Sequence, residues 1–174
     1  MPNMVLYSEL KDFKVINSLG EDKGKLAGLI VDLSNWNVKN LIISPRILKK
    51  KVVYKMEDMK EVKEHDKKIV IPNEVEEGEM PEKSSMSAAL VEDALLGKEV
   101  VSSDGHEVGK VYDFDIPLKL KNWMVWKILI KRGIKERRLR LGHEDIESVS
   151  ENIMLKKSLS ELESHEEEEK KEKK

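Results

Sequence analysis

The 174-residue sequence contains no cysteine, which excludes disulfide bonds, a thiol nucleophile and cysteine-ligated metal centres. Its longest apolar run covers only residues 26–31, far short of the roughly 20 residues that a transmembrane helix needs. The N-terminal segment does not pair a basic stretch with an apolar one, so we predict no signal peptide. A net charge of -2 provides no overall attraction to nucleic acid or to anionic lipid. Together these absences predict a soluble, cytoplasmic protein without direct membrane insertion.

What the chain contains most clearly is an internal duplication. Residues 15–33 resemble residues 100–118 at an offset of 85, and residues 36–43 resemble residues 123–130 at an offset of 87. Within each copy, apolar and polar residues alternate with a period near two, and turn-forming residues separate the alternating segments. This pattern indicates short strands that curl into small sheets. The predicted fold class is all-β, with two tandem small antiparallel β-barrels and a few short helices.

Composition predicts where the two copies begin and end. Residues 5–73 form the first and more divergent repeat, and residues 88–158 form the second. Between them, residues 74–87 are acidic and contain Gly, Pro and three serines, a composition typical of a linker. Residues 86–96 predict a short helix that leads into the second repeat. Residues 159–174 form an almost wholly polar tail, which we expect to be disordered or a fraying helix that does not dock in a core.

A glycine pattern near the start of each repeat imitates a nucleotide-binding loop. In the first repeat it consists of Gly20, Gly24 and Lys25, and it recurs 85 residues later. A phosphate loop needs one more residue between the glycines and a Ser or Thr after the lysine, where this chain has Leu26. We therefore predict a hairpin turn in both repeats.

No arrangement of residues in the sequence predicts catalysis or a bound cofactor. There is no nucleophile elbow, and no serine has an evident histidine partner. Asp113 and Asp115 follow His106, but alternate carboxylates on a strand are typical of its solvated face. The prediction is a non-enzymatic protein with no catalytic, metal or cofactor site.

One strand of the second repeat has more apolar residues than a single barrel interior can hold. Alternation places on the interior face Met124, Trp126, Ile128 and Ile130. The opposite face carries Trp123, Val125 and Leu129, and the first repeat has the milder pair Trp36 and Val38. The other barrel, a second subunit in a homodimer or a partner protein must cover such a face. These five residues are the candidate protein-binding surface, although internal or homodimer packing is the favoured explanation.

Residues 131–140 form a basic segment that suggests an alternative site. Its cations are Lys131, Arg132, Lys135, Arg137, Arg138 and Arg140. A hairpin with this charge would bind a phosphate backbone, including that of RNA. The other interpretation is the solvated side of a strand whose apolar side carries Leu139 and Leu141. No aromatic residue is interleaved in the segment for base stacking.

The second repeat resembles a PRC-barrel domain. The family's opening G-K-x-V, its hairpin D-G-x-x-[VI]-G-x-V-x-D and its late apolar segment recur in this order over residues 97–157. The matching residues are Gly97, Lys98, Val100, Asp104, Gly105, Val108, Gly109, Val111, Asp113, Ile146, Val149 and Ile153. The first repeat departs from the pattern, because Leu19 and Gly28 stand in place of the two aspartates.

The resemblance implies all-β modules of protein recognition, a fold to which no catalytic residues belong. Such barrels occur in the H subunit of photosynthetic reaction centres and in the ribosome-maturation factor RimM. Two barrels with a charged tail are similar to archaeal PRC-barrel proteins, some of which act in FtsZ-based cell division by binding SepF. The resemblance therefore implies a protein-protein interaction adaptor at the division site, with SepF or FtsZ as its partner. The alternative is a RimM-like RNA- or ribosome-associated factor that uses the basic 131–140 hairpin.

Overall fold

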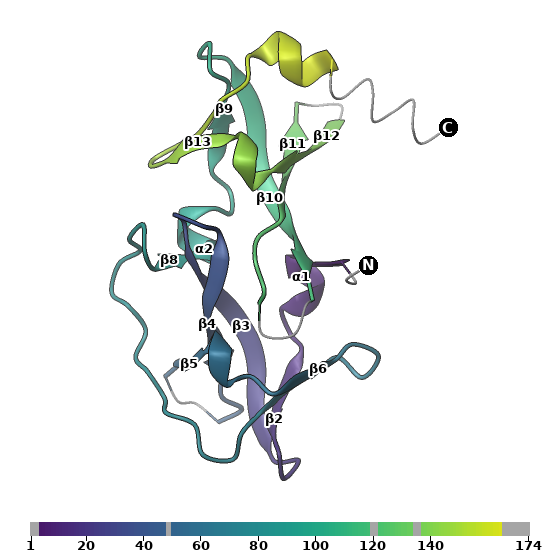
Figure 1. Ribbon diagram of the computed structural model, residues 1–174, viewed down its shortest axis with the longest axis vertical. Helices are drawn as coiled ribbons and strands as arrows, with labels where there is room; N and C mark the ends of the chain where they lie inside the picture. Colours follow the sequence, from purple (N-terminus) through teal and green to yellow (C-terminus); the bar gives the residue numbers. More distant parts are fainter. Residues whose placement is uncertain (1–3, 48–49, 119–121, 134–136, 165–174) are drawn as a thin grey trace. The chain divides into compact units, whose positions relative to one another are not determined.

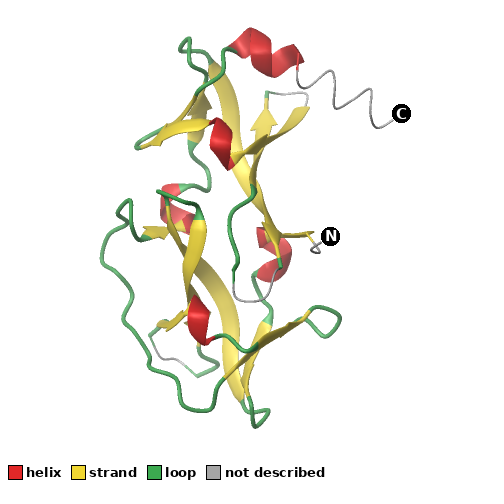
Figure 2. Cartoon of the chain, viewed as in Figure 1, coloured by secondary structure: helices red, strands yellow, loops and turns green. Residues whose placement is uncertain are grey.

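The computed structural model describes residues 4–47, 50–118, 122–133 and 137–164 (Figures 1 and 2). Their strands form two seven-stranded sheets. The first sheet contains β2 (Lys14–Asn17), β3 (Asp22–Asp32), β4 (Asn37–Ser44), β5 (Val52–Lys55), β6 (Glu61–Lys63), β7 (Lys68–Ile71) and β8 (Ala89–Leu90). The second contains β1 (Met4–Leu6), β9 (Glu99–Val101), β10 (Glu107–Pro117), β11 (Lys127–Arg132), β12 (Arg137–Gly142), β13 (Ile146–Val149) and β14 (Ile153–Leu155). The helical turns are α1 (Tyr7–Leu10), η1 (Met56–Asp58), α2 (Val91–Ala94) and η2 (His143–Asp145). The predicted all-β class with two β domains is confirmed.

The two sheets repeat one strand order. The first runs β5-β4-β3-β2-β7-β6, and the second runs β12-β11-β10-β9-β14-β13. Most neighbouring strands are antiparallel, but β2 pairs with β7 in parallel, and so does β9 with β14. The antiparallel prediction did not include these pairs. They arise because the last strand of each repeat, β7 or β14, lies beside the short strand β2 or β9 in addition to pairing with its own hairpin neighbour.

The short leading strand of each sequence repeat pairs with the long strand of the other repeat. β1 pairs with the end of β10, where Val5 lies opposite Ile116. β8 pairs with β3, where Leu90 lies opposite Ile30. The prediction of a helix over residues 86–96 is therefore only partly correct. Ala89–Leu90 form β8 of the first sheet, and only Val91–Ala94 are helical.

The chain divides into two compact units that regroup the sequence repeats. The first unit is Met1–Asp93 with Phe114–Trp126, and the second is Ala94–Asp113 with Lys127–Lys174. The proposed boundaries 5–73 and 88–158 describe the duplication, whereas the units follow strand pairing. No helix in the part of the chain that the structure describes is long and apolar enough to cross a bilayer.

Residues 74–87, which composition predicts as a linker, lie against the first sheet, and we call them the strap. Gly78 and Val53 exchange two backbone hydrogen bonds, of 2.7 and 3.1 Å, at the edge of β5. Met80 packs against the buried side chains of Ile30, Ile42, Val53 and Leu90. The linker prediction misjudged this segment because one apolar side chain and its backbone amides suffice to hold it on the sheet.

The tail begins with a helical turn over residues 159–164, whose Leu162 is fully buried. Ser158 and Glu161 start this turn with reciprocal contacts, since the Glu161 amide donates to Ser158 Oγ and the Ser158 amide donates to Glu161 Oε1. This is a capping box, and it has the S-x-x-E spacing typical of that motif. The expectation that the tail does not dock is wrong for residues 159–164, and residues 165–174 lie outside the described residues.

Candidate functional site

Four of the five candidate protein-binding residues come together in the first unit. The Val38 amide donates to the Trp123 carbonyl over 2.8 Å, and the Val125 amide donates to the Trp36 carbonyl over 2.9 Å. An antiparallel bridge between Asn37 and Met124 lies between these bonds. Residues 36–38 therefore pair with their own counterparts from the second repeat, which lie 87 residues later.

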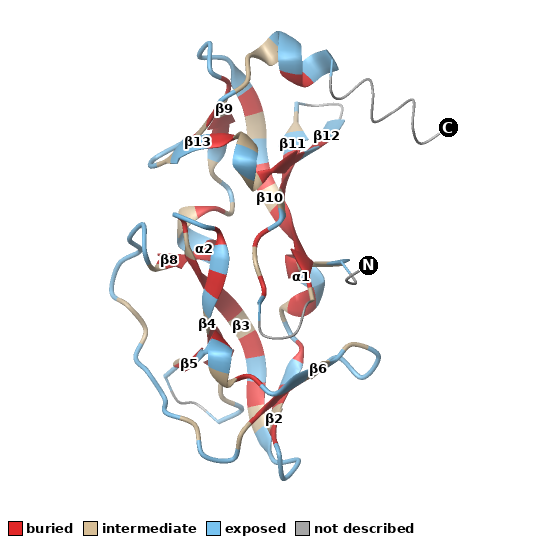
Figure 3. Ribbon diagram, in the orientation of Figure 1, coloured by how far each residue is buried: buried red, intermediate tan, exposed pale blue. Residues whose placement is uncertain are grey.

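This pairing leaves the candidate residues inside the protein. Trp36, Val38, Trp123 and Val125 are all buried, and so is Leu129 on β11. Figure 3 colours much of β3 and β10 as buried. They do not form an exposed docking face, which corrects the proposed protein-binding surface. The physical reason is that two apolar segments that pair edge to edge bury each other's side chains. The indole Nε1 of Trp123, which is 1% exposed, has no hydrogen-bond partner among the described residues.

Trp126 is exposed to solvent, whereas the sequence pattern predicted a buried side chain. Alternation placed it in the barrel interior with Ile128 and Ile130, but its side chain is 44% exposed. β11 begins only at Lys127, so residues 123–126 do not continue the alternation of that strand. Ile128 and Ile130 are buried as predicted.

Met4 is a second exposed apolar residue, and it lies on the other side of β10 from Trp126. The Trp126 amide donates to the Asp115 carbonyl of β10 over 2.9 Å. On the other side of β10, Met4 lies opposite Pro117, and its side chain is 48% exposed. Both residues belong to the first unit. The end of β10 is thus flanked by two large apolar side chains that contact water.

The basic 131–140 segment contains the hairpin of β11 and β12, as predicted. Some of its cationic side chains contact other residues of the protein. Lys131 lies opposite Arg138, whose guanidinium stacks 5.0 Å from the ring centre of Tyr112. Arg132 approaches Glu163 at 4.0 Å. Arg137 and Arg140 are exposed, and Lys135 lies outside the described residues. β12 ends the strand order of its sheet, where charged side chains discourage edge-to-edge aggregation.

The predicted glycine hairpin is present as β2 and β3. Val15 lies opposite Gly24, and the carboxamide of Asn17 accepts hydrogen bonds from the amides of Leu19 and Glu21 in the turn. Gly24 has a φ of +119°, and a Cβ there would collide with the carbonyl oxygen of Ser44. Close approach of two strands therefore explains this glycine without a nucleotide.

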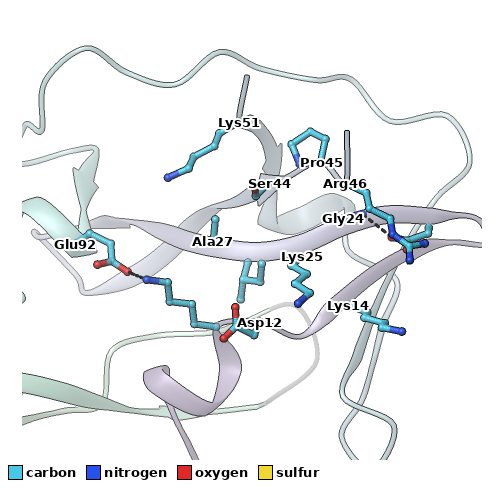
Figure 4. Close-up of a pocket in the computed structure, with 13 residues that line it drawn as sticks. Asp12, Lys14, Gly24, Lys25, Ala27, Ser44, Pro45, Arg46, Lys51 and Glu92 are labelled. Atoms are coloured by element: carbon cyan, nitrogen blue, oxygen red, sulfur yellow. Dashed lines mark hydrogen bonds and ion pairs between the residues drawn. The ribbon is translucent and has the colours of Figure 1, made fainter. Parts of the chain in front are cut away.

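A hollow on the first unit is lined mainly by charged side chains from β2, β3 and their surroundings. Its volume is about 820 Å³. An ion pair lies at each end, Lys11 with Glu92 at 2.8 Å and Arg46 with Asp22 at 3.1 Å, and Lys25 lies between them (Figure 4). Sequence analysis did not identify this hollow, because its residues come from separate strands.

Glu92 closes one end of the hollow as a carboxylate. Burial acts to raise the pKa of Glu92, but hydrogen bonds from Lys11 Nζ and Tyr7 Oη outweigh that effect and lower it. The bond from Tyr7 is 2.6 Å long. Within the described residues, no three histidine or carboxylate side chains gather as a metal-binding set.

Comparison with known protein families identifies the first part of the chain. A family model described as the PRC-barrel domain matches residues 2–77, the repeat that departs more from the sequence pattern. A comparison with curated proteins finds no match. The second sheet repeats the strand order of the first, as two such barrels in tandem would. Residues 2–77 are thus a PRC-barrel domain.

Proposed function

We propose that this protein is a non-enzymatic adaptor that binds a partner protein through the exposed apolar surface around Trp126. The single observation that carries the proposal is the different burial of the three tryptophans. Trp36 and Trp123 are core residues, whereas Trp126 is 44% exposed. Exposed tryptophan is uncommon on a monomer, and tryptophan is enriched among residues that dominate binding energy.

The surroundings of Trp126 support the proposal. Met4 adds a second exposed apolar side chain on the other side of β10. Both side chains are attached to backbone that is hydrogen-bonded to β10, so binding would not require that backbone to be ordered first. The PRC-barrel resemblance implies a recognition module, and SepF of the division machinery is the partner that it suggests.

Titration calorimetry with purified SepF from the same organism tests this function. Trp126→Ala should weaken binding by about 30-fold or more, the effect of losing a residue that dominates an interface. Leu19→Ala is the matched control, because Leu19 is 71% exposed in the β2–β3 turn of the same unit and should not matter. Both variants should unfold at the temperature of the unchanged protein.

Two results would contradict the proposal in different ways. Equal binding by the unchanged protein and Trp126→Ala would show that the surface around Trp126 is not the binding site. Failure of the unchanged protein to bind either SepF or FtsZ would contradict the proposal that its partner belongs to the division machinery.

A further inference from the structure

Four lysines form one lateral row across the first sheet, which we call the lysine row. Lys14 of β2 lies directly opposite Lys25 of β3. On its other side, Lys14 is in register with Lys68 of β7, and Lys68 lies opposite Lys63 of β6. Residues in register on neighbouring strands point to the same face of a sheet, so the four side chains share one face.

The row places like charges where a sheet normally avoids them. Adjacent strands are about 4.8 Å apart, so the four lysines span about 14 Å. This separation between neighbours is shorter than the Debye length of about 8 Å at physiological ionic strength, and like charges directly opposite each other destabilise a sheet. All four side chains are exposed or half-buried and therefore accessible to a ligand.

The carboxylates nearest the row form no direct ion pair with its lysines in the described part of the chain. Asp12, Glu61 and Asp66 lie two residues from row lysines on the same strands or the adjoining turns. None of these carboxylates forms an ion pair with a row lysine in the described part of the chain, where Asp22 and Glu92 are paired with other cations.

The second repeat is an internal control for this arrangement. Lys110 of β10 occupies the position equivalent to Lys25, at the offset of 85. Its partner in register is Glu99, which occupies the position equivalent to Lys14. The same strand pair thus holds opposite charges in one repeat and like charges in the other. The fold itself does not require a lysine at position 14.

The geometry points to the lysine row as a binding site for the phosphate backbone of a nucleic-acid duplex, contacted without reading its bases. A row of point charges matches a regular series of phosphates, and lysine lacks the bidentate geometry that arginine uses for base edges. No Phe, Tyr or Trp stands two residues from a row lysine, so the row lacks the large aromatic platforms typical of proteins that bind unpaired bases. The inference goes beyond the adaptor role and uses other residues.

Fluorescence anisotropy with a labelled 20-base-pair duplex tests the inference. Four neutralised phosphates predict that log affinity falls with log salt at a slope of about -3.6, which is about a 150-fold loss between 50 and 200 mM salt. K14E/K63E, which alternates the charge sign along the row, should abolish most binding and reduce the slope. K55E/K83E is the matched control, because Lys55 and Lys83 are exposed lysines of the same unit outside the row.

The variant should remain folded because K14E copies the Lys110–Glu99 pairing of the second repeat, and K63E likewise places opposite charges on the facing positions 63 and 68. K14E/K63E should unfold at or above the temperature of the unchanged protein, and the neutral K14Q/K63Q provides a second variant with an intermediate effect on binding. Trp126→Ala should bind the duplex normally, so the adaptor proposal and this inference fail separately.

Three results would overturn the inference. The first is no duplex binding at 50 mM salt. The second is binding of polyphosphate or of vesicles containing anionic lipid in preference to the duplex. The third is loss of binding in R138E/R140E with full binding by K14E/K63E, which would assign nucleic acid to the 131–140 hairpin instead.

Discussion

Replacement of Trp123 tests the account of the paired segments at residues 36–38 and 123–125. The side chain is 1% exposed, so Trp123→Ala removes a fully packed aromatic residue. Such truncations cost about 3–5 kcal/mol. The buried Nε1–H has no partner among the described residues, a defect that costs about 1–3 kcal/mol in the native protein. Trp123→Ala removes this defect as well, so we expect a loss near 3 kcal/mol, at the lower end of the range.

Trp123→Phe separates packing from the unpaired amine. Phenylalanine keeps most of the apolar contact and has no N–H to leave unsatisfied. We expect its stability to lie within about 1 kcal/mol of the unchanged protein, because the lost area and the removed defect oppose each other. The comparison uses urea unfolding at pH 7, and thermal unfolding should show a drop of about 6–12 °C for Trp123→Ala alone.

The outcome that would refute this reasoning is equal destabilisation by both variants, since that would mean the N–H is satisfied in the protein. Unchanged stability of Trp123→Ala would refute the burial itself. Either way, Trp123→Ala is not a clean probe of partner binding, because the residue belongs to the core.

Two further predictions follow from local contacts. Burial, followed by the charge of the hydrogen-bonded Glu77, raises the pKa of Tyr54 to about 12. Because the folded protein binds this proton more tightly than the unfolded chain, its contribution to stability is complete below pH 10 and is lost as the pH rises toward 12. The difference in melting temperature between the unchanged protein and Tyr54→Phe should therefore shift in favour of Tyr54→Phe between pH 10 and 11.5, and a constant difference would contradict the assignment. Ser158→Ala removes the N-cap of the 159–164 turn and should cost about 1 kcal/mol of local stability. Hydrogen exchange should report faster exchange of the 159–164 amides, and unchanged exchange there would show that the cap contributes nothing.

Sequence patterns predicted the local parts of the fold correctly. The glycine spacing around Gly24 predicted the β2–β3 hairpin, and alternation around Ile128 predicted a strand. Hairpins are formed by neighbouring residues, so turn chemistry and period-two patterning carry most of the information.

The errors arose where distant partners outweigh local composition. Residues 86–90 have the composition of a helix, yet two of them form β8, which pairs with β3. The acidic strap has the composition of a linker, yet Met80 packs on the first sheet. Trp126 fits the alternation of β11 but lies before the strand begins. Tertiary pairing overrode a weak local preference in each case.

By itself, the sequence determined that the chain is a duplicated all-β protein with a PRC-barrel pattern. Repeats, turns and alternation can be recognised from residues that are close together in the chain. Only the tertiary structure decided which side chains share a surface. It buried Trp36 with Trp123, exposed Trp126, and brought Lys63, Lys14 and their neighbours into one row from four strands. Strand register determines such a row, and register depends on the pairing of segments that lie about 50 residues apart in the chain.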